Sequence, residues 1–425
     1  MKHLFICTLF LSITASLLGQ DLEYAKDIIS KLSSPDFKGR GYVEEGNQIA
    51  AKYIKDQFTQ IGLKPFKKDY YQSFKIDVNV FPDKVLLSFD KEELVAGKDF
   101  IIDASSPSLK GEFSTYTVSK QDLMIDANVR KAIEQTAGKF LIIDERKFKS
   151  DDKESVKKLN ELINFLKYSP QVPSAGTIVL TSEKLTWDIS SEQGGKVSFT
   201  VCKDIDIKTI SKIKVEVNAS LIKSKTQNIV GFIEGTTQPD SFLVAVAHYD
   251  HLGKMGKEVY FPGANDNASG VAMLLTLAKY FKAYPPKYSV AFIALTAEEI
   301  GIVGAKEFVE NPLFDLKKTK FLVNFDLAGT GDDGIKVVNG SIYKKQFDLL
   351  TDLNSKNSYL KSVQIRGAAC NSDHCMFYQK GVPCFYIYTL GGIQAYHDIY
   401  DKYETLPLTK FVDYAKLMID FYKSF

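Results

Sequence analysis

Side chains that could bind a metal or move a proton follow short apolar stretches in the second half of the chain. The stretch at 242–247 is followed by His248 and Asp250, and another is followed by the adjacent acids Glu298 and Glu299. Acids held this close together need a cation or a shared proton. Imidazole and carboxylate are ligands that suit zinc, with cobalt or manganese able to substitute. The pattern therefore indicates metal-assisted chemistry.

Three further polar residues stand in comparable places. Asp266 lies in a glycine-flanked turn at 263–270 that leads into a helix, Asp326 follows another apolar stretch, and His397 lies near the end of the chain. Each motif alone has a plainer explanation: Asp266 could complement the helix dipole, and a histidine beside an acid is common on surfaces. The ordered set, in a chain with five histidines, is what favours a metal site.

The elements around these motifs predict an α/β fold with a mostly parallel mixed sheet. Continuous apolar runs that alternate with helices are what a sheet covered on both faces requires, and open sheets of this kind bind ligands at the carboxyl ends of their strands. In an extended chain His248 and Asp250 point the same way, so the carboxylate can hold the second imidazole nitrogen. The predicted strands are 242–247, 289–295, 320–325 and 382–388, and the predicted helices are 271–281, 302–309 and 408–422.

The first half of the chain divides into two parts. Apolar residues at helical spacing predict two amphipathic helices between 21 and 74, with a glycine-punctuated loop at 37–41. From 80 to 221 short β-prone runs dominate, interrupted by one charged helix at 151–166. We interpret 80–221 as a strand-rich domain inserted into the main domain, 21–79 and 222–425; an elaborate set of loops on a single domain is the alternative.

The N-terminus and the composition bear on location and partners. Residues 1–20 combine a basic start with a short apolar run, which predicts a cleaved signal peptide and a secreted or periplasmic protein; the run is too short to span a bilayer. With 54 basic and 52 acidic residues, no charge excess favours nucleic acid. Four cysteines remain after cleavage, and Cys370 could pair with Cys375 or both could be free thiols.

This ordered set of motifs resembles the co-catalytic zinc aminopeptidases of peptidase family M28. The likeness covers 21 to about 74 and 227–425, and it implies the phosphorylase/hydrolase-like α/β fold of those enzymes. Residues 80–221 resemble, less sharply, the protease-associated domain found in such enzymes. The segment 372–374 also fits the family, as part of the site wall, so His374 is not expected to be a ligand. Asp398 is a departure, because many relatives carry a small or hydroxyl residue there.

The resemblance implies two zinc ions per chain, with Asp266 as the bridge. It assigns His248 and Glu299 to one ion, and it assigns Asp326 and His397 to the other. Glu298 is then the general base that activates a metal-bridging water, Asp250 is the partner of His248, and the peptide bond after Asp266 is expected to be cis. The implied substrates are peptides with a free N-terminus.

Three other functions fit parts of the pattern. A glutaminyl cyclase shares the fold but uses one zinc, and a non-catalytic receptor ectodomain keeps the fold after losing ligands, although no ligand position is lost here. A carboxypeptidase of the same family needs a basic cluster for an acidic C-terminal residue, and Arg366 with nearby lysines is too little to indicate one. Neither the side-chain preference nor the oligomeric state follows from the sequence.

Overall fold

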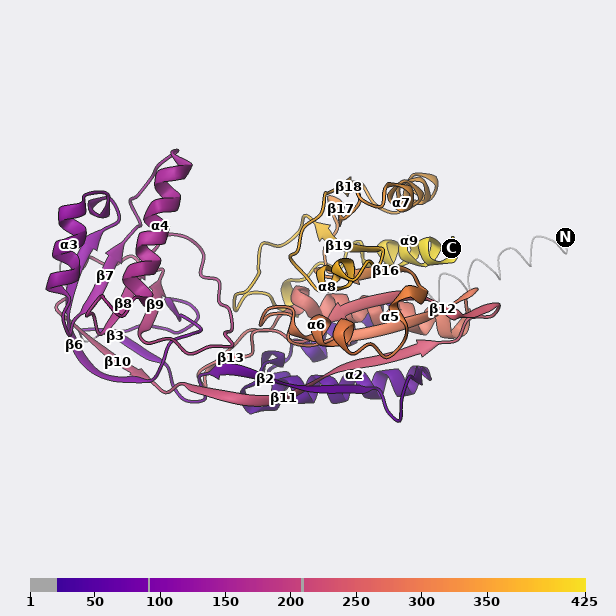
Figure 1. Ribbon diagram of the computed structural model, residues 1–425, viewed down its shortest axis with the longest axis horizontal. Helices are drawn as coiled ribbons and strands as arrows, with labels where there is room; N and C mark the ends of the chain where they lie inside the picture. Colours follow the sequence, from indigo (N-terminus) through magenta and orange to yellow (C-terminus); the bar gives the residue numbers. More distant parts are fainter. Residues whose placement is uncertain (1–20, 91, 208–209) are drawn as a thin grey trace.

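The computed structural model describes residues 21–90, 92–207 and 210–425, so the predicted signal peptide lies outside the described part. Figure 1 shows an elongated molecule with one sheet toward each end. Within the described residues the larger sheet has nine strands in the order β1-β11-β15-β12-β16-β19-β17-β18, with β2 also paired to β11. The smaller sheet has eight strands in the order β4-β3-β10-β6-β7-β8-β9-β5.

The centre of the larger sheet is parallel and buried on both faces. Strands β15 (Tyr288–Leu295), β12 (Gln238–His248), β16 (Thr319–Phe325) and β19 (Cys384–Leu390) lie side by side in parallel. Alternate residues of β12 enter two different apolar clusters, one on each face. This arrangement confirms the predicted α/β class with a mostly parallel mixed sheet.

Helices cover both faces of this sheet. The N-terminal helical residues 21–32, α2 (Gly46–Ile61), α5 (Gly270–Ala283) and α9 (Phe411–Lys423) contribute to the cluster on one face. The other cluster contains residues of α6 (Val303–Glu310) and α8 (His374–Gln379). Other elements of this half are β1 (Lys64–Pro65), β17 (Gly334–Val338), α7 (Lys344–Asn357), β18 (Val363–Ile365) and the small hairpin of β13 (Lys254–Met255) and β14 (Val259–Tyr260).

The smaller sheet is built around four parallel strands. These are β6 (Leu109–Ser119), β7 (Phe140–Asp144), β8 (Gly176–Leu180) and β9 (Val197–Val201). One face packs against α3 (Asp126–Gln135) and α4 (Lys153–Tyr168). Its flanking strands are β3 (Leu86–Phe89), β4 (Glu92–Glu93), β5 (Phe100–Ile102) and β10 (Lys212–Val217).

Two features join the sheets. Strands β2 (Tyr71–Val80) and β11 (Ser220–Ile233) form a long antiparallel ribbon in which 71–80 pairs with 220–229 (Figure 1). The second apolar cluster of the smaller sheet also takes in Leu252, Met255 and Phe261, which follow β12. A continuous core therefore holds the smaller sheet against loops of the larger one.

The cysteine and membrane questions have direct answers in the described residues. Cys370 and Cys375 form a disulfide, whereas Cys202 and Cys384 are free. No helix of the described part combines the length and apolarity needed to cross a bilayer.

Candidate metal centre

The predicted ligands converge at the carboxyl edge of the larger sheet. His248 Nε2 lies 3.4 Å from Asp266 Oδ1 and 3.5 Å from Asp326 Oδ1. His397 Nε2 lies 3.3 Å from Asp266 Oδ2 and 3.1 Å from Glu299 Oε2. The carboxylate of Asp266 thus stands between the two imidazoles and presents one oxygen to each.

The chemistry of this donor set fits zinc. Two ligands on one tetrahedral zinc, each bonded at about 2.0–2.1 Å, stand roughly 3.3 Å apart, which is the spacing seen here. His248, Asp266 and Asp326 have side chains at most 9% exposed, and Asp326 Oδ1 has no hydrogen-bond partner among the described residues. Buried acids without such partners need cations or protons.

The nearest contacts favour a pairing other than the one that the resemblance implied, although His248, Asp266 and Glu299 also lie close enough together to form a ligand group. His248 stands beside Asp326, not Glu299, and His397 stands beside Glu299. Strand β12 lies between β15 and β16, and His248 at its end meets Asp326, which comes directly after β16. Glu299 stands in the turn beyond β15 and reaches the His397 loop instead.

Asp250 lies beside His248 but does not hold it as expected. The ring nitrogen Nδ1 of His248 lies 3.2 Å from the main-chain carbonyl of Asp250 and 3.7 Å from its carboxylate. The carboxylate instead accepts the backbone N–H groups of Glu298 at 3.2 Å and Glu299 at 3.3 Å. Asp250 therefore shapes the turn that carries the two glutamates.

That turn gives the adjacent glutamates different surroundings. Ala297 has a left-handed backbone (φ 58°) and is buried, so the chain turns sharply where β15 ends. Glu298 lies within a possible ligand group with His248 and Asp326, and burial raises its pKa well above the usual range. Burial acts on Glu299 in the same direction, but His397 and His251 hold the pKa of Glu299 well below its usual range.

Buried Arg40 and buried Asp401 hold the loop that carries Asp266 through hydrogen bonds to its backbone. Arg40 donates to the carbonyls of Gly263 and Asp266 in this loop, and to those of Leu32, Tyr249 and Pro262 around it. Asp401 accepts the N–H groups of Asn265 at 2.8 Å and Asp266 at 2.9 Å. The peptide bond between Asp266 and Asn267 is cis, as predicted.

Sequence reasoning missed Arg40, Asp401 and two other neighbours of the ligands. His251 Nδ1 lies 2.7 Å from Glu299 Oε1, and Asp188 Oδ1 lies 3.0 Å from His397 Nδ1. In the sequence, His251 and Asp401 could have been noticed only because they lie near a predicted motif. Arg40 could have been noticed only because it lies between two glycines. Asp188 had no local signal, because its partner is 209 positions away.

The segment 372–374 lies in the wall of the site. Ser372 Oγ donates to Asp326 Oδ2 at 3.2 Å, and burial raises the pKa of Asp373 to about 8. The ring of His374 contacts the carbonyl of Ala369 and stacks on Tyr386. This placement agrees with the expectation that His374 is not a ligand.

Comparison with known proteins identifies the larger domain. The sequence profile of peptidase family M28 matches residues 228–422, which include all five predicted ligands. Residues 228–422 form a peptidase family M28 domain.

Relatives of the M28 domain include named peptidases. Aminopeptidase YwaD of Bacillus subtilis is 35% identical over 108 residues, which are 25% of this chain and 22% of that protein. A "Probable zinc metalloprotease" of Pyrenophora tritici-repentis is 33% identical over 110 residues, 25% of each chain. The matches thus span only about a quarter of the length of these relatives.

Solved structures resemble the whole chain, smaller sheet included. The zinc aminopeptidase BSAP from Bacillus subtilis has a TM-score of 0.68 at 17% identity, and the match covers 95% of this chain and 94% of that one. A peptidase M28 precursor from Shewanella amazonensis has a TM-score of 0.70 at 14% identity and covers 96% of both chains. At these identities the likeness establishes the fold.

Proposed function

We propose that this protein is a zinc aminopeptidase that binds two zinc ions and removes N-terminal residues from peptides. Asp266 would be shared by the two ions, His248 and Asp326 would hold one of them, and Glu299 and His397 would hold the other. The observation that carries the proposal is the position of the Asp266 carboxylate, with one oxygen within 3.4 Å of each imidazole nitrogen. Membership of residues 228–422 in a peptidase family supports the same conclusion.

The residues around the metals have distinct tasks in this proposal. Zinc bound there supplies Lewis acidity, which lowers the pKa of a water and polarises the scissile carbonyl. Glu298 takes the proton of the attacking water and delivers it to the leaving amine. Asp250 keeps Glu298 in place by accepting its backbone N–H.

Two measurements on the purified protein test this function. Elemental analysis should find two zinc ions per chain, and aminoacyl fluorogenic substrates should be cleaved only when their α-amino group is free. Removal of zinc with a chelator should abolish turnover, and added zinc should restore it. One zinc per chain together with cyclisation of N-terminal glutamine would instead identify a glutaminyl cyclase. Equal cleavage of acetylated substrates would contradict an aminopeptidase.

The remaining features of the proposal concern domains and location. Residues 80–221 would be an inserted protease-associated-like domain, carried on the β2–β11 ribbon. Export would follow from the basic start and apolar run at 1–20. N-terminal sequencing of the protein recovered from the medium or periplasm tests export, with a mature chain starting near Asp21 as the expected result.

A further inference from the structure

One segment of the smaller sheet reaches the loop that carries His397. This 184–188 segment lies between β8 and β9, and it makes four polar contacts with residues 394–398. The backbone N–H of Trp187 donates to the carbonyl of His397 at 2.8 Å, and Asp188 Oδ1 lies 3.0 Å from His397 Nδ1. Lys184 Nζ donates to the carbonyl of Gln394 at 2.8 Å and lies 2.6 Å from Asp398 Oδ2.

The contact between Asp188 and His397 decides which nitrogen of His397 is free for a metal. His397 Nε2 faces Glu299 and Asp266, so Nδ1 is the nitrogen left to carry the proton. An acceptor at Nδ1 fixes the tautomer and the ring orientation, as the neighbours of metal-binding histidines generally do. Asp188 is that acceptor.

The two imidazoles of the site are therefore oriented from different parts of the molecule. His248 Nδ1 contacts the carbonyl of Asp250, which belongs to the same loop after β12. His397 Nδ1 contacts a carboxylate from the smaller sheet. Of the two imidazoles, His397 is thus the one whose ring is oriented by a side chain of the smaller sheet.

The 184–188 segment is firmly anchored on its own side. The indole of Trp187 is 3% exposed, and its N–H donates to the carbonyl of Ile102 at 2.8 Å. The ring also stacks on Phe261, with centroids 4.7 Å apart and planes at 22°. Because Phe261 immediately precedes the Pro262–Asp266 stretch held by Arg40, Trp187 ties the segment to both sides of the interface.

We propose that Asp188 is a positioning residue through which the smaller sheet tunes zinc affinity at the His397 half of the centre. The inference rests on the proposed two-zinc function and adds a regulatory contact to it. Displacement of the 184–188 segment removes the acceptor from His397 Nδ1 and weakens zinc binding there. The Lys184–Asp398 ion pair holds the same loop, and this gives a role to the unusual acid at 398.

Zinc affinity of the full chain tests the proposal without reference to turnover. Competition with a chromophoric chelator should show two zinc ions on the wild type. Asp188→Ala should weaken one of them by about tenfold, the lower end of the usual effect of such neighbours, because the Asp188 side chain is 76% exposed. Asp188→Asn keeps an acceptor, so its zinc affinity should lie between those of the wild type and Asp188→Ala. Glu183→Gln removes a nearby exposed acid whose side chain has no hydrogen bond or ion pair with His397 among the described residues, and it should bind zinc as the wild type does.

Trp187 offers a second readout, since it is the one tryptophan in the sequence. Zinc added to the metal-free wild type should change its fluorescence, and in Asp188→Ala the same change should need about ten times more zinc. Two tight zinc ions in both the wild type and Asp188→Ala would overturn the inference and leave the proposed function standing. A wild type that binds no zinc would overturn the proposed function itself. Equal weakening by Glu183→Gln would show a general charge effect and would also overturn the inference.

Discussion

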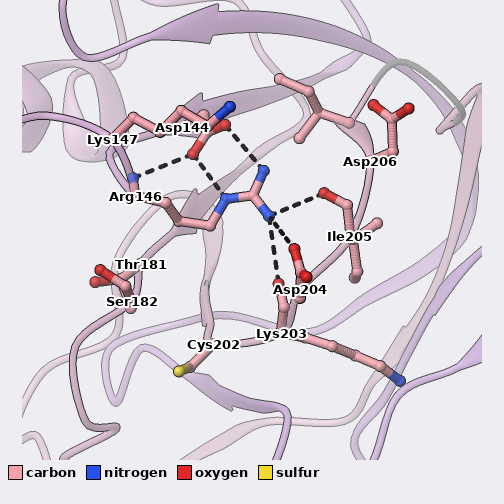
Figure 2. A pocket seen from close by; sticks show the side chains of 11 residues that line it. Asp144, Arg146, Lys147, Thr181, Ser182, Cys202, Lys203, Asp204, Ile205 and Asp206 are labelled. Atoms are coloured by element: carbon pink, nitrogen blue, oxygen red, sulfur yellow. Dashed lines mark hydrogen bonds and ion pairs between the residues drawn. The ribbon is translucent and has the colours of Figure 1, made fainter.

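In both sheets, acidic residues lie at the carboxyl ends of the parallel strands, but the partners of these acids differ. At the edge of β7, β8 and β9, Arg146 donates to both oxygens of Asp144 at 2.9 Å (Figure 2). Its remaining donors reach the carbonyls of Lys203 and Ile205, and Lys203 itself lies 2.6 Å from Glu92. The cavity at this edge measures about 810 Å³.

At the edge of β12, β15 and β16 no lysine or arginine ion pair with Asp266, Glu299 or Asp326 is found among the described residues. Arg40 is near, but its donors go to main-chain carbonyls. The contacts of the acids are to imidazoles, which are ligands in their own right. Buried acids that no lysine or arginine neutralises therefore need a metal ion or a proton, whereas Asp144 is already neutralised by Arg146.

The sharpest test of this contrast removes one carboxylate from each edge. Asp266→Ala should lose the bridge and with it both tightly bound zinc ions, so that turnover falls to background. Asp144→Ala should keep the zinc content of the wild type. Elemental analysis after dialysis measures both. Two tight zinc ions in Asp266→Ala would refute the bridging role.

The next largest effect is expected from a variant of Glu298, which tests proton transfer at the metal centre separately from metal binding. Glu298→Gln keeps the size of the side chain and removes its basicity, so kcat should fall by about 10²- to 10⁴-fold. Its zinc content should be unchanged. Glu310→Gln at the exposed end of α6 is the matched control and should keep full activity. Near-wild-type turnover in Glu298→Gln would show that another group is the base.

A third change tests Arg40, the buried cation near the metal site that donates to main-chain carbonyls and not to the acids. Lysine has three donors and cannot replace the five contacts of Arg40, so Arg40→Lys should lower the free energy of unfolding by about 3 kcal/mol. The loss should appear in the metal-free protein, because the contacts do not involve a ligand side chain. Urea unfolding of metal-free samples measures it, and exposed Arg130→Lys is the control. Equal stability of the two variants would contradict a structural role for the guanidinium.

The smallest expected effect is the stability contributed by the Asp144–Arg146 pair of the smaller sheet, which depends on pH. Arg146 holds the pKa of Asp144 below its ordinary value. The pair therefore adds stability above about pH 4, where the unfolded carboxyl is ionised, and this stability is lost as the pH falls through the lowered pKa. Solvent screening keeps it near 1 kcal/mol. Asp144→Ala should thus be about that much less stable at pH 7, and the gap should close in acid; a gap that widens in acid would contradict the ion pair.

Much of the fold follows from local sequence patterns. The predicted strand at 289–295 differs from β15 by one residue, and the predicted helix at 271–281 lies within α5. Periodicity carries this information because burial on one or both faces acts on every few residues. The long strands β2 and β11 were not predicted, since they form a ribbon whose pairing is not local.

The sequence by itself determined that His248, Glu299 and Asp326 stand at or just after the ends of central strands, which predicts that they share one edge of the sheet. Tertiary structure alone decided which acids and imidazoles are neighbours: β12 lies between β15 and β16, and the turn at Ala297 after β15 leads Glu299 toward the His397 loop. It also decided the contacts of Arg40 and Asp188. Those depend on chain segments about two hundred positions apart, which no local spacing can reveal.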